Sequence, residues 1–282
     1  MEEFRRVVIV TGAGRGIGKS VAIAFAKQKA SLSLIARTLA ELEQVAGEIG
    51  EGELRPMIQQ CDIGDPNQVD KVVSATLKRF GRIDVLVNNA GIQGPIGPVE
   101  DLDFDSWKRV IDVNLMGTLR LMQRVIPVMK GQRWGRILNV SGGGATSALP
   151  RFTAYAASKV AIVRLTETIA QEVKEYGICV NAVAPGNVNT RMTEEAIAAG
   201  DRAGPEHVKK LRSIKDQGGI SSGLVANLIL FLASDEASGI TGRLLSAVWD
   251  NWKAIIEHQV ELGSSDIYTL RRILPEDRGF KW

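Results

Sequence analysis

Cysteine and histidine are scarce in this sequence. The chain of 282 residues contains two cysteines, Cys61 and Cys179, and two histidines, His207 and His258. Both cysteines lie in apolar, strand-like stretches, which is typical of reduced core thiols and argues against a disulfide framework. The histidines have no cysteine at ligand spacing, so the sequence predicts no metal site.

Long hydrophobic runs and an excess of one charge are also lacking. No apolar run approaches the roughly 18 residues that a membrane helix needs. The N-terminal segment MEEFRRVVIVTG carries two acidic residues and lacks the regions of a signal peptide. The 35 basic residues, against 32 acidic ones, are scattered along the chain, which argues against a nucleic-acid-binding surface. We therefore expect a soluble, cytoplasmic protein that binds neither membranes nor nucleic acid.

Short β-branched runs alternate with longer segments of helical period. The predicted strands are 6–10, 31–36, 55–61, 83–88, 136–140, 178–183 and 243–247, and the predicted helices are 16–29, 38–49, 66–80, 104–130, 154–176 and 221–233. This βαβα order favours an α/β fold of the Rossmann type, a doubly wound parallel sheet of seven strands with helices on both faces. Its ligand crevice is expected at the carboxyl ends of the strands.

Two segments fall outside this alternation. Residues 186–220 form a long connection of the kind that often acts as a lid or binding segment. Residues 250–282 follow the last strand and are too aromatic for a disordered end. We expect one dinucleotide-binding and catalytic domain over residues 1–249, and a tail over 250–282 that covers the cleft or a subunit interface.

A glycine-rich turn follows the first strand and opens the next helix. Its glycines let the backbone approach a pyrophosphate, and the free N–H groups at the helix start favour negative charge. A tight turn made only for helix packing is the alternative, but the strand, turn and helix context favours a dinucleotide. The predicted cofactor residues in this turn are Thr11, Gly12, Gly14, Arg15, Gly16, Ile17 and Gly18.

The end of the second strand indicates which dinucleotide binds. An NAD-preferring protein usually has an acidic residue there, whereas this chain has Ala36, Arg37 and Thr38. Arg37 offers a bidentate donor to a 2′-phosphate, and Arg15 can join it from the glycine turn. The alternative interpretation is that Arg37 is only a solvated charge on the surface. The sequence therefore predicts NADP(H), with NAD(H) less favoured.

Tyr155 and Lys159 are four residues apart, which places them on one face of a helix. A phenol is a poor base at neutral pH, and a nearby ammonium group is expected to lower its pKa toward the working pH. Tyr155 would then protonate a carbonyl oxygen while hydride arrives, or accept the alcohol proton in reverse. Taken alone, a tyrosine and a lysine four residues apart are common on helix surfaces and do not indicate a function.

Taken in order, these motifs resemble those of the short-chain dehydrogenase/reductase family over residues 1–247. The resemblance implies that Tyr155 and Lys159 are the catalytic pair, that Asn114 holds a water in a proton relay with the lysine, and that Asp62 contacts the adenine. It extends to the fourth-strand motif 88–91 and to the nicotinamide segment 185–190. The further cofactor residues that it implies are Asp62, Ile63, Asn89, Ala90, Gly91, Tyr155, Lys159, Pro185, Gly186, Val188 and Thr190. Each of these motifs can also be explained by structure alone, because such residues tie strand ends together, satisfy a helix carbonyl or form an ordinary turn.

One position departs from the family pattern. The family has a catalytic serine thirteen residues before the tyrosine, where this chain has Gly142. Ser141 precedes it, and the glycine run after it could let its hydroxyl reach the substrate oxygen. Alternatively, the substrate oxygen is held by a backbone N–H, by Thr146 or Ser147, or by no group at all. The glycines could instead make room for a bulky substrate.

The sequence predicts an NADP(H)-dependent oxidoreductase that interconverts a ketone or aldehyde and an alcohol, with Asn114, Ser141, Tyr155 and Lys159 as catalytic residues. A weakened NADP(H)-binding sensor and a non-redox lyase or epimerase of the same fold are the alternatives. In the resembling family, the helices corresponding to 104–130 and 154–176 pack against their copies. We therefore expect a homodimer or homotetramer.

Overall fold

Seven parallel strands form one sheet in the computed structural model, which describes residues 5–52 and 55–282. The strand order is β3-β2-β1-β4-β5-β6-β7. The strands are β1 (Val7–Thr11), β2 (Ser31–Ala36), β3 (Met57–Gln60), β4 (Val85–Asn88), β5 (Gly135–Val140), β6 (Ile178–Ala184) and β7 (Leu244–Ser246). The order reverses between β1 and β4, which makes the carboxyl ends of these two strands the switch point where ligands bind. The predicted doubly wound, Rossmann-type sheet is confirmed.

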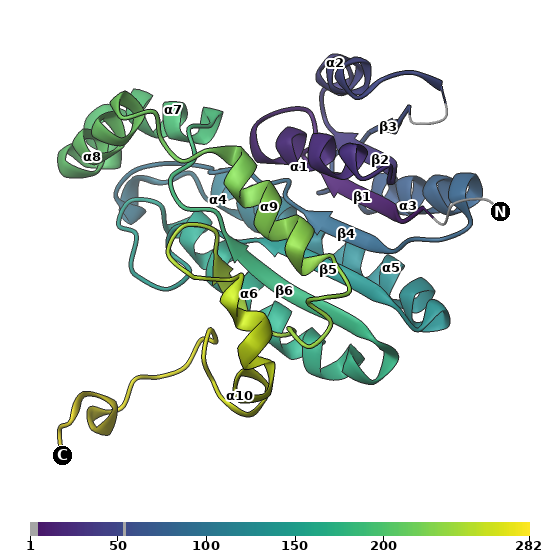
Figure 1. The fold of residues 1–282 in the computed structure, drawn as a ribbon. Coiled ribbons are helices and arrows are strands. Elements are labelled where there is room, and N and C mark those ends of the chain that lie inside the picture. Colours follow the sequence, from purple (N-terminus) through teal and green to yellow (C-terminus); the bar gives the residue numbers. More distant parts are fainter. Residues whose placement is uncertain (1–4, 53–54) are drawn as a thin grey trace.

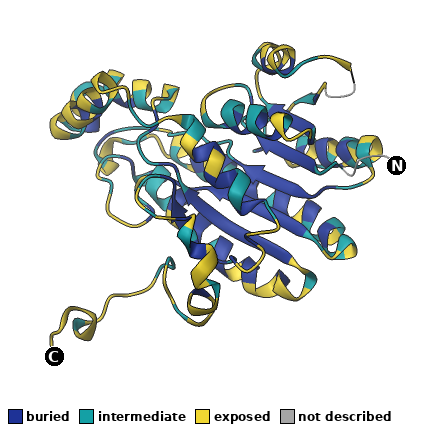
Figure 2. Cartoon of the chain, in the orientation of Figure 1, coloured by how far each residue is buried: buried dark blue, intermediate teal, exposed yellow. Residues whose placement is uncertain are grey.

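Residues 1–4 and 53–54 lie outside the described residues, so the expectation of no signal peptide stays a prediction from the sequence. The central strands are buried on both sides (Figure 2), and every residue of β1, β4 and β5 is buried. Parallel strands covered on both faces need apolar side chains at nearly every position. This explains why β1 and β4 are nearly continuous apolar runs rather than alternating patterns.

Helices cover both faces of the sheet (Figure 1). One face is packed by α1 (Gly16–Lys27), α2 (Leu39–Ile49) and α9 (Ser222–Leu232), and the other by α3 (Pro66–Phe80), α5 (Thr118–Gln132) and α6 (Thr153–Val173), with α4 (Phe104–Ile111) beside α6. Each face has its own apolar cluster. The short 3₁₀ segments are Val99–Asp101, Lys174–Tyr176, Gly200–Ala203, Ala254–His258 and Pro275–Arg278. The helix layers on the two faces of the sheet hold the strand ends in place at the switch point.

The predicted helix over 104–130 is confirmed as one helical stretch, but the prediction did not include a π-helical segment within it. A π-helical segment, Asp112–Gly117, separates α4 from α5. Within it, the side chain of Asn114 bonds to both the N–H and the carbonyl of Ile92, and its own carbonyl accepts a bond from Thr118 Oγ1. A π-bulge inserts one residue into the helix without changing its apolar period strongly, so periodicity alone does not detect it.

The long connection over residues 186–220, here called the lid segment, contains α7 (Arg191–Ala198) and α8 (Pro205–Asp216). These two helices pack on Phe152 and Tyr155, at the start of α6. The tail follows a different course. The buried guanidinium of Arg243 donates to the carbonyls of Ser265 and Ile267, and Trp252 packs on Phe231 with ring centroids 5.3 Å apart. The tail therefore lies along α9 and the β7 edge of the sheet.

After α10 (Gln259–Ser264), the chain returns to α6, where the N–H of Leu270 donates to Glu167 Oε1 at 2.7 Å, and residues 271–282 then lead away from the body of the molecule (Figure 1). None of the described tail residues lines the cleft described below. A subunit interface under the tail stays a prediction, as does the homo-oligomer. Among the described residues, no helix is both long and apolar enough for a membrane span. Cys61 and Cys179 are free, buried thiols, and the cytoplasmic location stays a prediction.

Candidate active site

A cleft of about 750 Å³ opens at the carboxyl ends of the strands. Most residues predicted from separate motifs line it together. They are Gly12, Gly14, Arg15, Gly16, Ile17, Arg37, Thr38, Asp62, Ile63, Asn89, Ala90, Gly91, Ser141, Tyr155, Lys159, Pro185, Gly186, Val188 and Thr190. Thr11, Gly18 and Asn114 lie behind this lining, where they shape it. The fold thus brings every predicted site residue to one edge of the sheet.

Thr11 and Gly18 hold the glycine turn against β4. Thr11 Oγ1 accepts bonds from the backbone N–H groups of Asn89 and Ala90, both at 3.0 Å. Asn89 Nδ2 donates to the carbonyl of Gly12 at 3.2 Å. A Cβ at Gly18 would lie 2.2 Å from the Gly12 carbonyl oxygen, so only glycine fits there.

The first turn of α1 has unused hydrogen-bonding capacity. Its N-cap, Arg15, makes no side-chain cap, and no acidic residue lies in the first turn. The N–H groups at such a helix start have no intrahelical partner and carry partial positive charge. This end of α1 therefore offers donors to an anion in the cleft.

An acidic residue that sequence reasoning missed lies beside this turn. Glu41 lines the cleft from α2, and its Oε1 accepts a bond from Arg15 Nη1 at 2.8 Å. Both side chains are partly exposed, and the exposed Arg37 lies at the same rim of the cleft. The only sequence signal for Glu41 was its position in the first turn of the helix after Arg37.

Asp62 is held in place by two groups. Its Oδ1 accepts the backbone N–H of Gly64 at 2.9 Å, and its Oδ2 accepts a bond from the guanidinium of Arg109 on α4. Arg109 has no motif signal, because it lies 47 positions away in the sequence. The pair orients the carboxylate at the mouth of the cleft.

Lys159 lies deep in the cleft with its ammonium group directed at the backbone. Its Nζ donates to the carbonyl of Val140 at 2.9 Å and is 5.5 Å from the ring centroid of Tyr155. Asn114 is fully buried, and its Nδ2 donates to Ser158 Oγ at 3.0 Å. A Cβ at Gly91 would lie 3.2 Å from Asn114 Oδ1 and 3.6 Å from Lys159 Nζ, so the loop after β4 passes close to both.

Burial shifts the pKa values of the candidate catalytic pair in opposite directions. It raises the pKa of Tyr155 to about 12 and lowers the pKa of Lys159 to about 8. The expectation that the lysine lowers the phenol pKa is therefore wrong for this arrangement. The reason is that burial dominates, while the ammonium group is directed at Val140. The phenol is therefore protonated at neutral pH.

Ser141 directly follows β5, and its backbone N–H donates to the carbonyl of Val183 at 2.8 Å. Its Oγ is buried and has no hydrogen-bond partner among residues 5–52 and 55–282. The alternatives Thr146 and Ser147 are exposed and do not line the cleft. Ser141 is thus the hydroxyl of this loop that lies at the cleft.

The lid side of the cleft mixes apolar side chains, such as Leu149 and Leu211, with polar ones, and sequence reasoning missed two of the polar residues, Gln93 and His207. The Oε1 of Gln93 is buried without a hydrogen-bond partner in the described chain. The ring of His207 packs on Phe152 with centroids 5.1 Å apart. Burial, with a smaller contribution from nearby Lys210, lowers the pKa of His207, so its imidazole is neutral at pH 7. The sequence indicated His207 only as a rejected metal ligand.

The charged side chains at this end of the cleft are paired. Arg191 Nε lies 3.1 Å from Glu195 Oε1, and Lys215 Nζ lies 3.5 Å from Glu194 Oε1. Ion pairs on this wall leave little net charge for a substrate to meet. Over the described ranges, no three His, Cys, Asp or Glu side chains cluster as metal ligands would.

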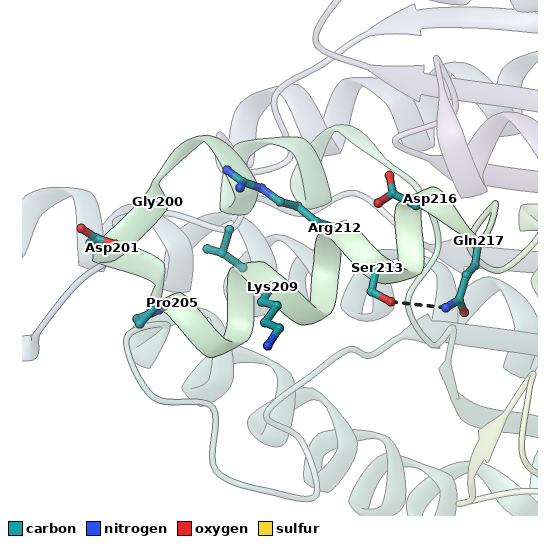
Figure 3. A pocket seen from close by; sticks show the side chains of 9 residues that line it. Gly200, Asp201, Pro205, Lys209, Arg212, Ser213, Asp216 and Gln217 are labelled. Atoms are coloured by element: carbon teal, nitrogen blue, oxygen red, sulfur yellow. Dashed lines mark hydrogen bonds between the residues drawn. The ribbon is translucent and has the colours of Figure 1, made fainter.

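A second hollow lies on the other side of α8 (Figure 3). It measures about 570 Å³ and is lined by Gly200, Asp201, Pro205, Val208, Lys209, Arg212, Ser213, Asp216 and Gln217. In it, Gln217 Nε2 donates to Ser213 Oγ at 3.3 Å. No predicted site residue lies there, and its lining comes from one short stretch of chain. We assign it no function.

Comparisons with known proteins agree with this geometry. A protein-family model described as short chain dehydrogenase matches residues 6–200. The 3-oxoacyl-[acyl-carrier-protein] reductase FabG of Thermotoga maritima is 35% identical over 252 residues, which cover 85% of this chain and 95% of that protein.

Two solved structures have the same fold and different cofactors. A variant of actinorhodin polyketide ketoreductase with NADPH has a TM-score of 0.79 and 28% identity, covering 86% of this chain and 95% of that one. An NAD⁺-bound xylitol dehydrogenase has a TM-score of 0.78 and 28% identity, covering 87% of this chain and 98% of that one.

Proposed function

This chain belongs to the short-chain dehydrogenase family, and we propose that it interconverts a ketone or aldehyde and an alcohol by hydride transfer with NADP(H). The observation that carries the proposal is the position of Tyr155. Its phenol lines the same cleft as the glycine turn, and its pKa of about 12 keeps it protonated at neutral pH. A bound nicotinamide cofactor would supply or accept the hydride. The protein would supply the proton.

The residues of the cleft fit a dinucleotide. The uncapped first turn of α1 offers N–H donors to a pyrophosphate, and the missing side chain of Gly12 lets the turn pack closely against Asn89 and Ala90. We assign the carboxylate of Asp62, whose Oδ1 accepts the Gly64 N–H, to an adenine edge. The segment 185–190 lies opposite, where a nicotinamide amide would meet Thr190 and the backbone of Val188.

Arg37 and Arg15 support NADP(H) over NAD(H). Neither Ala36 nor Thr38 carries a charge that would repel a 2′-phosphate, and the two guanidinium groups line the same rim of the cleft. The pairing of Arg15 with Glu41 reduces this preference without removing it, because exposed ion pairs exchange partners at low cost. Among the similar structures, the ketoreductase binds NADPH and the xylitol dehydrogenase binds NAD⁺.

In the direction of reduction, Tyr155 donates its proton to the carbonyl oxygen, and the ammonium group of Lys159 stabilises the phenolate that forms. Ser141 is the candidate second donor to that oxygen. Asn114 holds the loop after β4 through its bonds to Ile92. The paired charges of the lid side favour a neutral substrate, and Gln93 and His207 offer hydrogen bonds to a second polar group on it.

The test is a titration of the purified protein with NADPH and NADH, followed by NADPH oxidation over a panel of neutral ketones and aldehydes. Tighter NADPH binding, with turnover that is lost in Tyr155→Phe, is the expected result. Tight binding without turnover of any carbonyl would contradict the redox proposal.

A second candidate is an NADP(H)-binding sensor with little turnover. It is favoured by Gly142, which removes a side-chain donor that the family has near the reacting oxygen. Loss of one such donor typically lowers a rate by about 10² to 10³. The sensor would bind NADPH as tightly as the enzyme and would change conformation or partner rather than consume the cofactor.

We also propose a homodimer or homotetramer that forms through α5 and α6 and their neighbours. Exposed apolar side chains on these elements support it, since Phe104 is 74% exposed on α4 and Val160 is 39% exposed on α6. Sedimentation of the purified chain is the direct test, and a monomer at micromolar concentration would exclude the assembly.

A further inference from the structure

Tyr155 fills the place that a side chain at position 142 would need. A Cβ built on Gly142 would lie 2.3 Å from the phenol oxygen of Tyr155 and 3.0 Å from Cζ. Such contacts are far inside the normal approach of non-bonded atoms. The two residues are thirteen positions apart in the sequence, on the loop after β5 and on α6.

Space, rather than backbone conformation, excludes a side chain here. Gly142 is not among the glycines with positive φ, so its backbone would accept an L-residue. Gly144, two positions later, has φ of 89° and requires glycine for a different reason. The missing side chain at 142 therefore has a packing cause that involves one partner, Tyr155.

The ring of Tyr155 packs on an apolar cluster on one side and lines the cleft on the other. It packs in the apolar cluster of Phe152 and Leu211, and its backbone carbonyl accepts a bond from Ser158 Oγ at 2.7 Å. Rings packed between a helix and a lid have few alternative rotamers. A Cβ at position 142 would thus displace the phenol oxygen itself.

We propose that Gly142 is a positioning residue, whose missing side chain admits the Tyr155 phenol to the space that the family's serine takes. The inference rests on the proposed function in one respect, that this phenol is the proton donor. Restoring the serine would then disable the enzyme, although serine is the family's residue at this place. If Gly142 only removed a hydrogen-bond donor, in contrast, the same change to serine would restore activity.

The kinetic test compares Gly142→Ser with Gly142→Ala. Both are expected to lower kcat on the order of tenfold or more, because a displacement of about 1 Å at a reacting group costs up to about 10². The Kd for NADPH should stay unchanged. Gly131→Ala and Gly131→Ser in α5 are the controls, since nothing lies within 4 Å of a Cβ there. A kcat above wild type in Gly142→Ser, with no gain in Gly142→Ala, would overturn the proposal.

Gly143→Ala separates crowding of the tyrosine from crowding of the loop. A Cβ at Gly143 would make an ordinary contact, 3.5 Å from Leu149 Cδ2. This variant should therefore lose less activity than Gly142→Ala. An equal loss in both would attribute the effect to the loop and overturn the proposal.

A double-mutant cycle tests the contact without any need for activity. Tyr155→Phe removes the oxygen that lies 2.3 Å from the added Cβ. Gly142→Ala should lower Tm by about 2–4 °C in the tyrosine background, and by clearly less in the phenylalanine background. Equal losses in both backgrounds would show that the contact is absent. If no carbonyl is turned over, the proposed function fails while this cycle still decides whether Gly142 makes room for the phenol.

Discussion

The ammonium group of Lys159 donates a hydrogen bond to the carbonyl oxygen of Val140 at 2.9 Å, while its distance to the centre of the Tyr155 ring is 5.5 Å. The lysine therefore stands beside the phenol with its charge directed at the end of β5. A buried cation of this kind acts on its neighbour through the field and is itself costly to hold charged.

Tyr155→Phe should lower kcat for carbonyl reduction by about 10² to 10⁴, the usual contribution of a positioned proton donor. The substitution removes one oxygen and keeps the ring in its apolar cluster, so the fold and the NADPH affinity should be preserved. Steady-state kinetics and fluorescence titration measure the two quantities. A variant with kcat close to wild type would assign the proton to another group.

The rate of reduction should fall as the pH rises above about 8, since the pKa of Lys159 is about 8. Below this pH the lysine is charged and stabilises the phenolate that Tyr155 leaves behind, whereas above it that stabilisation is lost. Tyr155 stays protonated throughout, because its pKa is about 12. A pH profile of kcat measures the effect, and Lys159→Met should be slow and show no fall near pH 8. A wild-type profile that is flat to pH 10 would contradict the assignment.

Lys159 should also lower the stability of the fold at neutral pH. Its pKa falls from 10.5 in a free side chain to about 8 in the folded protein, so protonation favours the unfolded chain. The penalty is fully present below about pH 8 and disappears above 10.5. Relative to Lys159→Met, the wild type should therefore gain about 3 kcal/mol of unfolding free energy between these limits, as an upper estimate. Urea unfolding of both proteins at pH 7.5 and 10 measures it, and a constant difference would contradict the buried ammonium.

Glu41→Gln should raise the affinity for NADPH by about two- to fivefold, the range of an exposed ion pair, because it frees Arg15 from its carboxylate partner. Arg37→Ala should weaken NADPH binding and leave NADH binding nearly unchanged, since NADH has no 2′-phosphate. Parallel titrations with both cofactors measure the two effects. If Arg37→Ala weakens both cofactors equally, Arg37 does not select between them.

Ser141→Ala tests whether this hydroxyl contacts the reacting oxygen. As a donor, Ser141 should contribute about 10² to kcat, in line with a single oxyanion contact. As a buried hydroxyl without a partner, it would instead leave kcat unchanged and its removal would raise stability slightly. Kinetics and thermal unfolding of the same variant distinguish these two roles.

Several features could be predicted from the sequence because their signals are local. The glycine turn after β1, the Tyr155 and Lys159 spacing and the alternation of strands and helices each depend on residues that are neighbours along the chain. Because parallel strands end at one edge of a sheet, even the meeting of distant motifs in one cleft followed from the fold class. The strand and helix bounds agree within a few residues, except at the π-helical segment near Asn114.

Other features depend on side chains that meet only after folding. Glu41 reaches Arg15 across 26 positions, and Arg109 reaches Asp62 across 47. His207 enters the cleft because α8 folds back over Phe152. No periodicity or motif reports such distances, since they depend on how helices pack rather than on what each helix contains.

The sequence by itself determined the sheet, the cofactor turn and the identity of the candidate proton donor, because glycine conformation, apolar period and i, i+4 spacing are properties of short segments. Only the tertiary structure decided that the phenol is protonated and that its oxygen lies where a Cβ of Gly142 would be. Burial and close packing are properties of the assembled interior, where the dielectric environment and the available space are set by residues from many parts of the chain.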